Sequence, residues 1–521
     1  MGKGRMGNWR VWAGATAGRV SARARPLIER AWQPVNPALR RAALGYAYAP
    51  TRWVAGVAAG TGLVLAVAAI AATGPWQGGQ RVSDRAFAAG QTGVATHHGV
   101  ASGPPRPAGP AWHPPAMVLA PAGVSATVPT SGGVSSALAG PLADAALGRV
   151  TASVVDVADG RTLYSSGADE AQQPASTNKI ATATAALTLL GPGHRFTTKV
   201  VGDAGSGLVL VGGGDPTLTA SSGPDSLTAL AQATAKALRA AGVAPGGHAV
   251  KLRYDISLFA GPALHPIGVN GNIALVQALT ADEGRIDPRS TEDAPRDADP
   301  AAAAVATFAA ALATDGYAVD TSGGQGTTPG SAKPLAQVQS APLSDIVERM
   351  LTLSDNDIAE SLGHACALAA GRPATFAGGA DAVRATLTRL GVPLGSTHLA
   401  DSSGLSAQDV IPARALTALL VLDASPAHPE LRSVLSGLPI AGFTGTLDNR
   451  YGGDGSAAGL GVVRAKTGSL RTVNTLAGLV VDRSGRLLAF AFMSNGSSDA
   501  TSARVALDRL AARVAACGCG G

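Results

Sequence analysis

Alternating hydrophobic and polar positions predict strands at both ends of a globular body that begins near Pro141. Residues 150–157 alternate well enough for a strand, Asp159-Gly160 is a hairpin-turn signal, and residues 161–165 continue as a second strand. Near the other end, three consecutive strands are predicted over 462–470, 473–482 and 486–494. We therefore expect one antiparallel sheet made from both ends of the chain.

Helical spacing dominates the segments between these strands. After Ser176, the residues Ile180, Thr184, Leu187 and Leu190 recur at helical spacing, and the pair Gly191-Pro192 ends the run. Ser176 is thus expected at a helix N-terminus, with Lys179 one turn later on the same face. Further helices are predicted over 225–241, 342–370 (with a break at 354–357) and 500–516, a strand with a glycine turn over 207–218, and a polar loop over 287–300.

A long apolar run precedes this body. Residues 54–72 contain neither charge nor proline, and as a helix they would match the hydrocarbon thickness of a bilayer. We expect a single transmembrane signal anchor. The alternatives are a signal peptide cleaved after Ala69-Ile70-Ala71, or a buried core helix. Residues 73–140, rich in Gly, Pro, Ala and Ser, are predicted to be a semi-extended linker.

The charge distribution supports this topology. Residues 1–52 hold ten basic side chains and one acidic one, a net +9, so the chain's formal +6 leaves −3 on the remainder. A nucleic-acid-binding domain should carry its basic excess on the folded part, so a nucleic-acid partner is not expected. The positive-inside rule instead places residues 1–52 in the cytoplasm and the body outside the cytoplasmic membrane.

Three short motifs carry candidate chemistry: Ser176-x-x-Lys179, Ser354-Asp355-Asn356 and Lys466-Thr467-Gly468. The first alone is weak evidence, because a serine three residues before a lysine arises readily by chance. The three together are much more specific, since they occur in order and each falls in a suitable predicted element. Lys466, for example, is expected on a strand, whereas Ser354 falls in the break between two helices.

These residue types fit acyl transfer through a serine. The Ser176 hydroxyl needs an adjacent base, which Lys179 can supply if burial and a neighbouring cation such as Lys466 lower its pKa. Lys466 would also attract a substrate carboxylate. Ser354 can relay a proton to a leaving amine, and Asn356 can hold a peptide amide through its donor and its acceptor. The backbone N–H groups of Ser176 and Ser469 could form an oxyanion hole.

With these three motifs in this order, the sequence resembles the D-alanyl-D-alanine carboxypeptidase/endopeptidase family. These are the class C low-molecular-mass penicillin-binding proteins of the penicillin-binding-protein-4 type (peptidase family S13). The resemblance covers about 145–515. Besides the three motifs it rests on the segments GPGHRFTTKVV, LVLVGGGDPTL, YDISLFAGP, NIALVQALTADEGRIDP, LTLSDNDIAESLGHACA, DSSGLSAQDVIPARAL, LPIAGFTGTLDNRY and VRAKTGSLRTVNTLAGLV.

The resemblance implies an α/β sandwich: a penicillin-recognising, β-lactamase-like transpeptidase domain with an all-α cluster and an inserted domain. We expect the transpeptidase-like domain over 141–200 and 336–521, with the insertion over 201–335. Ser176, Lys179 and Ser354 would be catalytic. The substrate-binding residues would be Asn356, Lys466, Thr467, Gly468 and Ser469.

The implied enzyme is an exported serine D,D-peptidase that needs no cofactor and no metal. It would remove terminal D-alanine from peptidoglycan stem peptides and hydrolyse D-alanyl cross-links, and β-lactams would acylate Ser176. One alternative is a serine β-lactamase or esterase on the same fold, although no Glu-x-x-Leu-Asn sequence follows the second motif. Another is a non-catalytic exported binding module.

The cysteines add little to this prediction. Cys366 is expected to be buried, and whether Cys517 and Cys519 form a disulfide is left undecided by the sequence.

Overall fold

The computed structural model describes residues 126–519 except 291–292, 329–331 and 454. The basic arm 1–52, the predicted transmembrane helix 54–72 and most of the predicted linker 73–140 lie outside the described residues. Within the described part, none of the helices combines the length and the apolar character needed to cross a bilayer.

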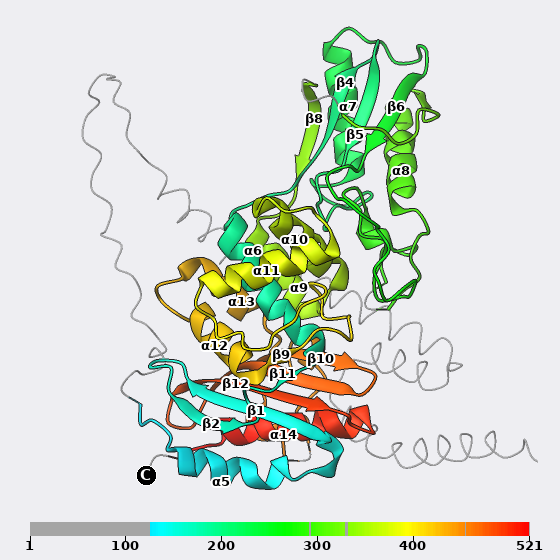
Figure 1. Cartoon of the computed structure of the whole chain (residues 1–521). Helices are drawn as coiled ribbons and strands as arrows, with labels where there is room; N and C mark the ends of the chain where they lie inside the picture. The colour runs from blue at the N-terminus through cyan, green and yellow to red at the C-terminus, as the bar shows by residue number, and fades with distance from the viewer. Residues whose placement is uncertain (1–125, 291–292, 329–331, 454, 520–521) are drawn as a thin grey trace, which may run out of the picture. The chain divides into compact units, whose positions relative to one another are not determined.

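The first sheet joins both ends of the chain. Strands β1 (Arg149–Asp156) and β2 (Thr162–Ser166) lie beside three late strands, in the order β10-β11-β12-β1-β2 (Figure 1). All pairs are antiparallel, and β1 runs along β12 from Arg149↔Asn495 to Asp156↔Leu488. This confirms the expected antiparallel sheet. The late strands are β10 (Arg464–Leu470), β11 (Val473–Val481) and β12 (Leu487–Asn495).

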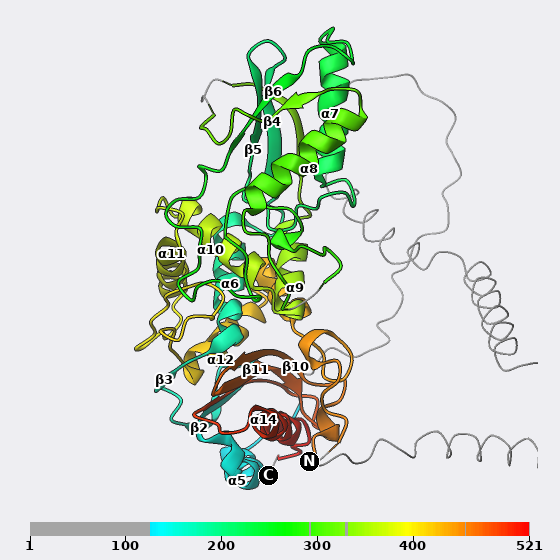
Figure 2. The same cartoon turned by 90° about the vertical axis from the view of Figure 1, so that its right-hand side faces the viewer.

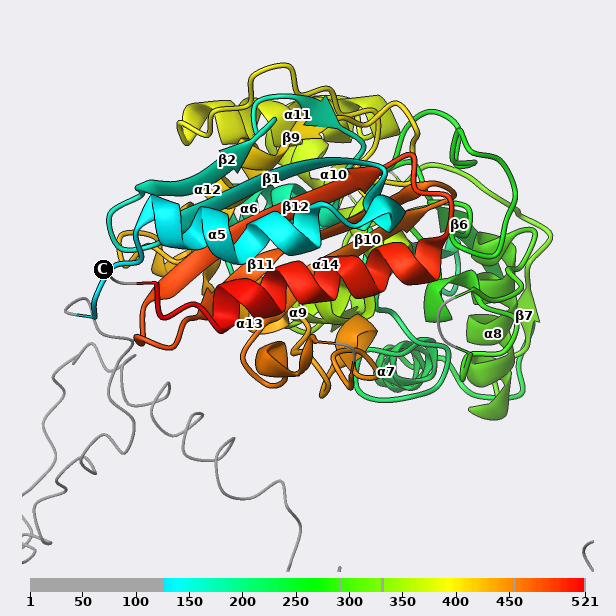
Figure 3. The same ribbon diagram turned by 90° about the horizontal axis from the view of Figure 1, so that it is seen from below.

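Both faces of this sheet are covered. Helices α5 (Ser131–Leu142) and α14 (Ala500–Ala515) lie side by side on one face (Figure 3), and α12 (Ala413–Asp423) packs on the other. Side chains of β12 alternate between the two faces. Phe490 and Phe492 enter the core on the α14 side, whereas Ala491 and Met493 enter the core on the α12 side. Burial on both faces explains why this strand is apolar at nearly every position.

A helical cluster lies between the first sheet and the second. Its close packing depends on glycine: a Cβ on Gly379 would stand 2.8 Å from the carbonyl carbon of Gly363 on the neighbouring helix. The helices are α6 (Asn178–Leu190), α9 (Leu343–Leu353), α10 (Asn356–Ala369), α11 (Phe376–Arg389) and α13 (Arg432–Gly437), with the short strand pair β3 (Ala171–Gln172) and β9 (Ile411–Pro412) beside them.

The second sheet is built from the chain between α6 and α9, in the order β7-β6-β5-β4-β8. Its β5–β6 and β6–β7 pairs are parallel and the others antiparallel. Helices α7 (Leu227–Ala240) and α8 (Pro300–Thr314) pack against it around Phe308 (Figure 2). The strands are β4 (Thr197–Asp203), β5 (Gly207–Val211), β6 (Val250–Asp255), β7 (Val319–Asp320) and β8 (Pro334–Gln339).

Short 3₁₀ helices complete the described elements: η1 (Ala145–Leu147), η2 (Ala175–Thr177), η3 (Asp282–Gly284), η4 (Pro429–Leu431), η5 (Gly445–Leu447) and η6 (Ala457–Gly459). The predicted helices over 180–190, 225–241 and 500–516 are confirmed as α6, α7 and α14. The predicted interruption near Ser354 is confirmed as the junction of α9 and α10.

The structure corrects the linker prediction at its C-terminal end. Helix α5 begins at Ser131, inside the stretch 73–140 that composition predicts to be a tether. The Thr130 side chain caps this helix by accepting from the Gly133 N–H, and Val134 and Leu138 are buried against the first sheet's helical layer. A helix rich in Ala, Gly and Ser has little local signal, so tertiary burial decides its structure.

Candidate active site

The Ser176 segment is held in an unusual backbone shape. Ala175 has φ 47°, in the left-handed region that L-residues rarely adopt, and Ser176 follows it in η2, just before α6. The Pro174 carbonyl accepts hydrogen bonds from Thr177 Oγ1 and Thr475 Oγ1, both at 2.7 Å. Ser176 therefore lies at the N-terminal end of a helix, as predicted. The residues before it are held to strand β11 by the hydrogen bond from Thr475.

Lys179 lies one turn later and is fully buried. Its Nζ donates to Ser176 Oγ at 2.9 Å, to Asn356 Oδ1 at 2.7 Å and to the Ser403 carbonyl at 2.8 Å. Burial lowers the pKa of Lys179 to about 8, against the opposing attraction of acidic groups, of which Asp401 is the largest. The main cause of the shift is thus burial, whereas the sequence had also suggested a neighbouring lysine.

The second motif forms the junction between α9 and α10. Ser354 ends α9 with φ 61°, and Asp355 caps α10 by accepting from the Ile358 N–H at 3.0 Å. Asn356 contacts both sides of the site, because its Oδ1 accepts from Lys179 and its Nδ2 donates to the Asn272 carbonyl at 3.0 Å. The motif therefore joins Lys179 to a loop of the segment that carries the second sheet.

The third motif lies on β10, the edge strand of the first sheet. Gly468 faces the Ser176 segment, where a Cβ would stand 2.1 Å from Thr475 Oγ1 and 2.5 Å from the Pro174 carbonyl oxygen. Thr467 Oγ1 shares a 2.8 Å hydrogen bond with Thr446 Oγ1. Only a residue without a side chain allows β10 to approach this closely.

Lys466 lies on a strand near Lys179, as the sequence suggested, but its side chain has no exposed surface. It is fully buried, and its Nζ donates to the Thr467 carbonyl at 2.9 Å. Burial, followed by repulsion from Lys179 and Arg450, lowers its pKa well below the usual lysine value. Lys466 therefore lies beneath the surface of the cleft, and its contact with a substrate carboxylate stays a prediction.

Sequence reasoning assigned no role to the loop 401–404, although its carbonyl at Ser403 holds Lys179. Asp401 shapes this loop by accepting from the N–H groups of Ser403, Gly404 and Ser406. Glu360, fully buried on α10, accepts from the N–H groups of Ser402 and Ser403. The available signal was the Asp-Ser-Ser-Gly sequence, in which Gly404 adopts φ 84°.

Burial raises the pKa of Glu360 to about 7, with repulsion by Asp401 as the next cause. His265 Nε2 lies 3.2 Å from Asp401 Oδ2 and 3.8 Å from Glu360 Oε1. The three side chains are close enough to share a metal ion. However, the carboxylates of Glu360 and Asp401 already accept several backbone N–H groups, so the cluster fits a structural support for the loop.

A second cluster of possible metal ligands consists of Glu283, Asp355 and Asp357. Its carboxylates also have protein partners. Asp357 accepts from the Ala274 N–H and from Arg296, both at 2.8 Å. Glu283 is paired with Arg285 and Arg349. In both clusters of the described residues, the donors present satisfy the carboxylates, which favours structural roles over metal binding.

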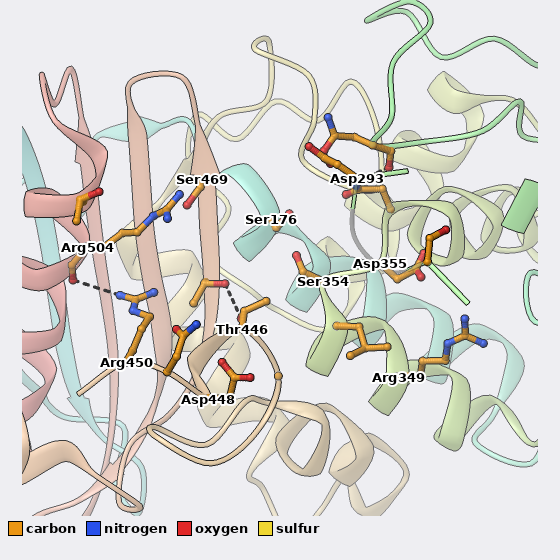
Figure 4. Close-up of a pocket in the computed structure, with 18 of the residues that line it drawn as sticks. Ser176, Asp293, Arg349, Ser354, Asp355, Thr446, Asp448, Arg450, Ser469 and Arg504 are labelled. Carbon is orange, nitrogen blue, oxygen red and sulfur yellow. Dashed lines mark hydrogen bonds between the residues drawn. The ribbon is translucent and has the colours of Figure 1, made fainter. Parts of the chain in front are cut away.

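The motifs open into one cleft of about 1150 Å³. Figure 4 shows Ser176 between Ser354 on the helical side and Ser469 on the strand side. Ser176, Ser354, Asn356, Thr467 and Ser469 line the cleft, whereas Lys179 and Lys466 lie beneath its surface. The arginines that line the cleft are Arg285, Arg289, Arg296, Arg349, Arg450 and Arg504. Figure 4 shows Arg349 on the helical side and Arg450 and Arg504 on the strand side.

Comparisons with known proteins agree with this geometry. The family model for the D-Ala-D-Ala carboxypeptidase 3 (S13) family matches residues 134–297 and 290–514. The chain is 38% identical over 488 residues to the carboxypeptidase DacB of Mycolicibacterium smegmatis, covering 90% of this chain and 99% of that relative. It is 29% identical over 427 residues to the D-alanyl-D-alanine carboxypeptidase of Actinomadura sp. strain R39, covering 66% and 77%.

A likeness among solved structures supports the fold. The crystal structure of penicillin binding protein 4 from Haemophilus influenzae matches with a TM-score of 0.58 at 22% identity. The match covers 72% of this chain and 97% of that one. The mixed α/β architecture described above is therefore shared with a solved protein.

Proposed function

The chain belongs to the D-Ala-D-Ala carboxypeptidase 3 (S13) family, and on that premise we propose which of its residues carry out the reaction. It is a D-alanyl-D-alanine carboxypeptidase, a penicillin-binding D,D-peptidase of peptidoglycan. One observation supports the residue roles above all others: the 2.9 Å contact between the buried Lys179 Nζ and Ser176 Oγ at the floor of the cleft.

In the acylation step, Ser176 is the nucleophile and Lys179 the base. The neutral amine of Lys179 takes the proton from Ser176 Oγ as that oxygen attacks the carbonyl carbon of the penultimate D-alanine. The backbone N–H groups of Ser176 and Ser469 stabilise the oxyanion. When the peptide bond breaks, the proton passes through Ser354 to the nitrogen of the departing D-alanine.

Asn356 and strand β10 position the peptide. The Asn356 amide is already held by Lys179 and by the Asn272 carbonyl, so its orientation is set before substrate arrives. Thr467 and Ser469 offer hydroxyl donors to the terminal carboxylate, and Gly468 lets the strand lie against the Ser176 segment. Water then hydrolyses the acyl-enzyme, and the same steps applied to a D-alanyl cross-link give endopeptidase activity.

The domain organisation and location belong to the same proposal. We assign 141–200 and 336–521 to the transpeptidase-like domain and 201–335 to an insertion, to which the whole of β4 and β8 belongs through the second sheet. Asn272 of the insertion contacts Asn356 of the second motif, and Arg296 pairs with Asp357, the residue that follows this motif. Export across the cytoplasmic membrane, with residues 54–72 as a single-pass anchor, suits an enzyme whose substrate lies outside. The basic residues of 1–52 would then stay in the cytoplasm.

Mass spectrometry of muropeptides incubated with the enzyme tests these roles. Wild type should release D-alanine, Ser176→Ala should release none, and Ser221→Ala, a matched change at an exposed serine of the insertion, should behave as wild type. A fluorescent penicillin should label wild type stably and leave Ser176→Ala unlabelled. Continued D-alanine release by Ser176→Ala would refute the mechanism, and rapid penicillin turnover would favour a β-lactamase.

A further inference from the structure

Arg504 lies at the strand-side end of the cleft. It is an exposed residue in the first turns of α14, and it lines the cleft together with Thr467 and Ser469. Figure 4 shows its side chain extending from α14 towards the end of β10, where Ser469 lies. A guanidinium is thus presented beside the hydroxyl groups that the proposed function assigns to the terminal carboxylate.

The Arg504 backbone is fixed while its side chain is available. Arg450 donates to the Arg504 carbonyl at 3.2 Å and pairs with Asp508 at 2.7 and 3.0 Å. Among the described residues, no hydrogen bond or ion pair involves the Arg504 guanidinium. Arg450 is occupied by Asp508, so Arg504 is the arginine at this end whose charge remains uncompensated.

The proposed reaction places a negative charge of the substrate at this end of the cleft. The leaving D-alanine carries a carboxylate next to the nitrogen of the bond that breaks, so the carboxylate must lie just beyond Ser176. Thr467 and Ser469 are neutral donors, and Lys466 is buried and donates to the Thr467 carbonyl. A guanidinium matches a carboxylate with two parallel N–H donors, which gives a stronger contact than hydroxyl groups alone.

We propose that Arg504 binds the terminal carboxylate of the substrate and thereby sets the preference for peptides with a free C-terminal D-alanine. This inference rests on the proposed D,D-peptidase function and deepens it. Arg504 is a specificity-determining residue in this proposal, since it contacts the part of the substrate that distinguishes a free acid from its amide.

The test compares two substrates that differ only at that group: a peptide ending in D-alanyl-D-alanine and the same peptide as its C-terminal amide. The quantity measured is the acid-to-amide ratio of kcat/KM. For Arg504→Gln we expect this ratio to fall about tenfold, which corresponds to 1.4 kcal/mol, through a higher KM for the acid. Arg504→Lys should retain part of the preference. Arg513→Gln, on the same helix but not lining the cleft, should keep the wild-type ratio.

Two results for Arg504→Gln would overturn the proposal. An unchanged ratio in Arg504→Gln would overturn the proposal. An equal loss on both substrates would also overturn it, because that pattern indicates a structural role. Fluorescent-penicillin labelling of each variant checks that the site still forms. If wild type itself released no D-alanine from the acid peptide, the proposed function would fail, which is distinguishable from failure of the Arg504 assignment.

Discussion

At Lys179, one amino group is held by three acceptors from three separate segments of the chain: Ser176, Asn356 and the Ser403 carbonyl. A fully buried ammonium is costly, and these contacts offset part of that cost. The balance leaves the pKa of Lys179 at about 8, low enough for a useful fraction of neutral amine near neutral pH. The lowered pKa of Lys179 is therefore due mainly to burial, which outweighs the attraction of the acidic groups nearby.

This pKa predicts the pH dependence of the enzyme. Lys179 must be neutral to accept the Ser176 proton, and below about pH 8 it is mainly protonated. We expect kcat/KM for D-alanine release to rise with pH through a midpoint near 8 and then level off. A pH series of initial rates measures this. A profile that is flat between about pH 6 and about pH 9 would contradict the role of Lys179 as base.

A second residue-scale prediction concerns Gly468. Adding a methyl group in Gly468→Ala places a carbon within 2.1 Å of Thr475 Oγ1, so β10 or the Ser176 segment must shift. We expect acylation by penicillin to slow at least tenfold, with a loss of about 1–3 kcal/mol in the free energy of unfolding. Gly193→Ala, where nothing lies within 4 Å, is the control. Normal acylation in Gly468→Ala would show that close approach is unnecessary.

At the scale of elements, the break between α9 and α10 combines a structural and a chemical role. Ser354 ends one helix in the left-handed conformation, and Asp355 begins the next through its side-chain cap. The residues that stop the helix are thus the residues that enter the cleft. Sequence reasoning located this junction because Ser, Asp and Asn favour helix ends over helix interiors.

The loop 401–404 supplies a prediction at the same scale. Glu360 holds the Ser402 and Ser403 N–H groups, and its charge also raises the pKa of Lys179. Neutralising it in Glu360→Gln removes that attraction, so the midpoint of the pH–rate profile should move below about 8. Comparison with Glu170→Gln, a surface substitution on the β2 side of the body, isolates the effect. A midpoint that stays in place or moves upward would refute the coupling.

At the scale of the whole described chain, the two ends meet. The Thr130 N–H and hydroxyl both donate to the Cys519 carbonyl, at 3.0 and 3.1 Å, and Cys517 and Cys519 form a disulfide. Helix α5 packs beside α14, and β1 pairs with β12. The first sheet with its helical layer therefore depends on residues that lie well before Ser176 in the chain.

This closure predicts a stability effect far from the cleft. Leu138→Ala, at a fully buried position on α5, should lower the free energy of unfolding by about 3 kcal/mol, as expected for a buried leucine truncation. Urea denaturation measures the loss. The same substitution at Leu368, whose side chain is 39% exposed, should cost much less. Equal losses for the two variants would mean that α5 adds little to the fold.

The sequence could predict those features that depend on residues close to one another in the chain. Strand alternation, turn residues and helix-ending residues indicated the first sheet, α6 and the α9–α10 junction. The three motifs indicated Ser176, Lys179 and Ser354 as catalytic candidates and Asn356 as a substrate-binding candidate. Local signals work here because period, capping and turn chemistry act over a few residues. For the same reason they failed at α5, whose structure comes from burial against α14.

Other features follow only from tertiary structure. The Ser403 carbonyl reaches Lys179 from a point more than two hundred residues away, and Arg504 reaches the end of β10 from the last helix. Burial of Lys466 likewise moves it behind the cleft surface. Such contacts depend on which distant segments pack together, and hence on burial and charge compensation between them. The sequence alone therefore determined which residue types the three motifs supply, because these are local in the chain, whereas tertiary structure decided which distant groups surround them.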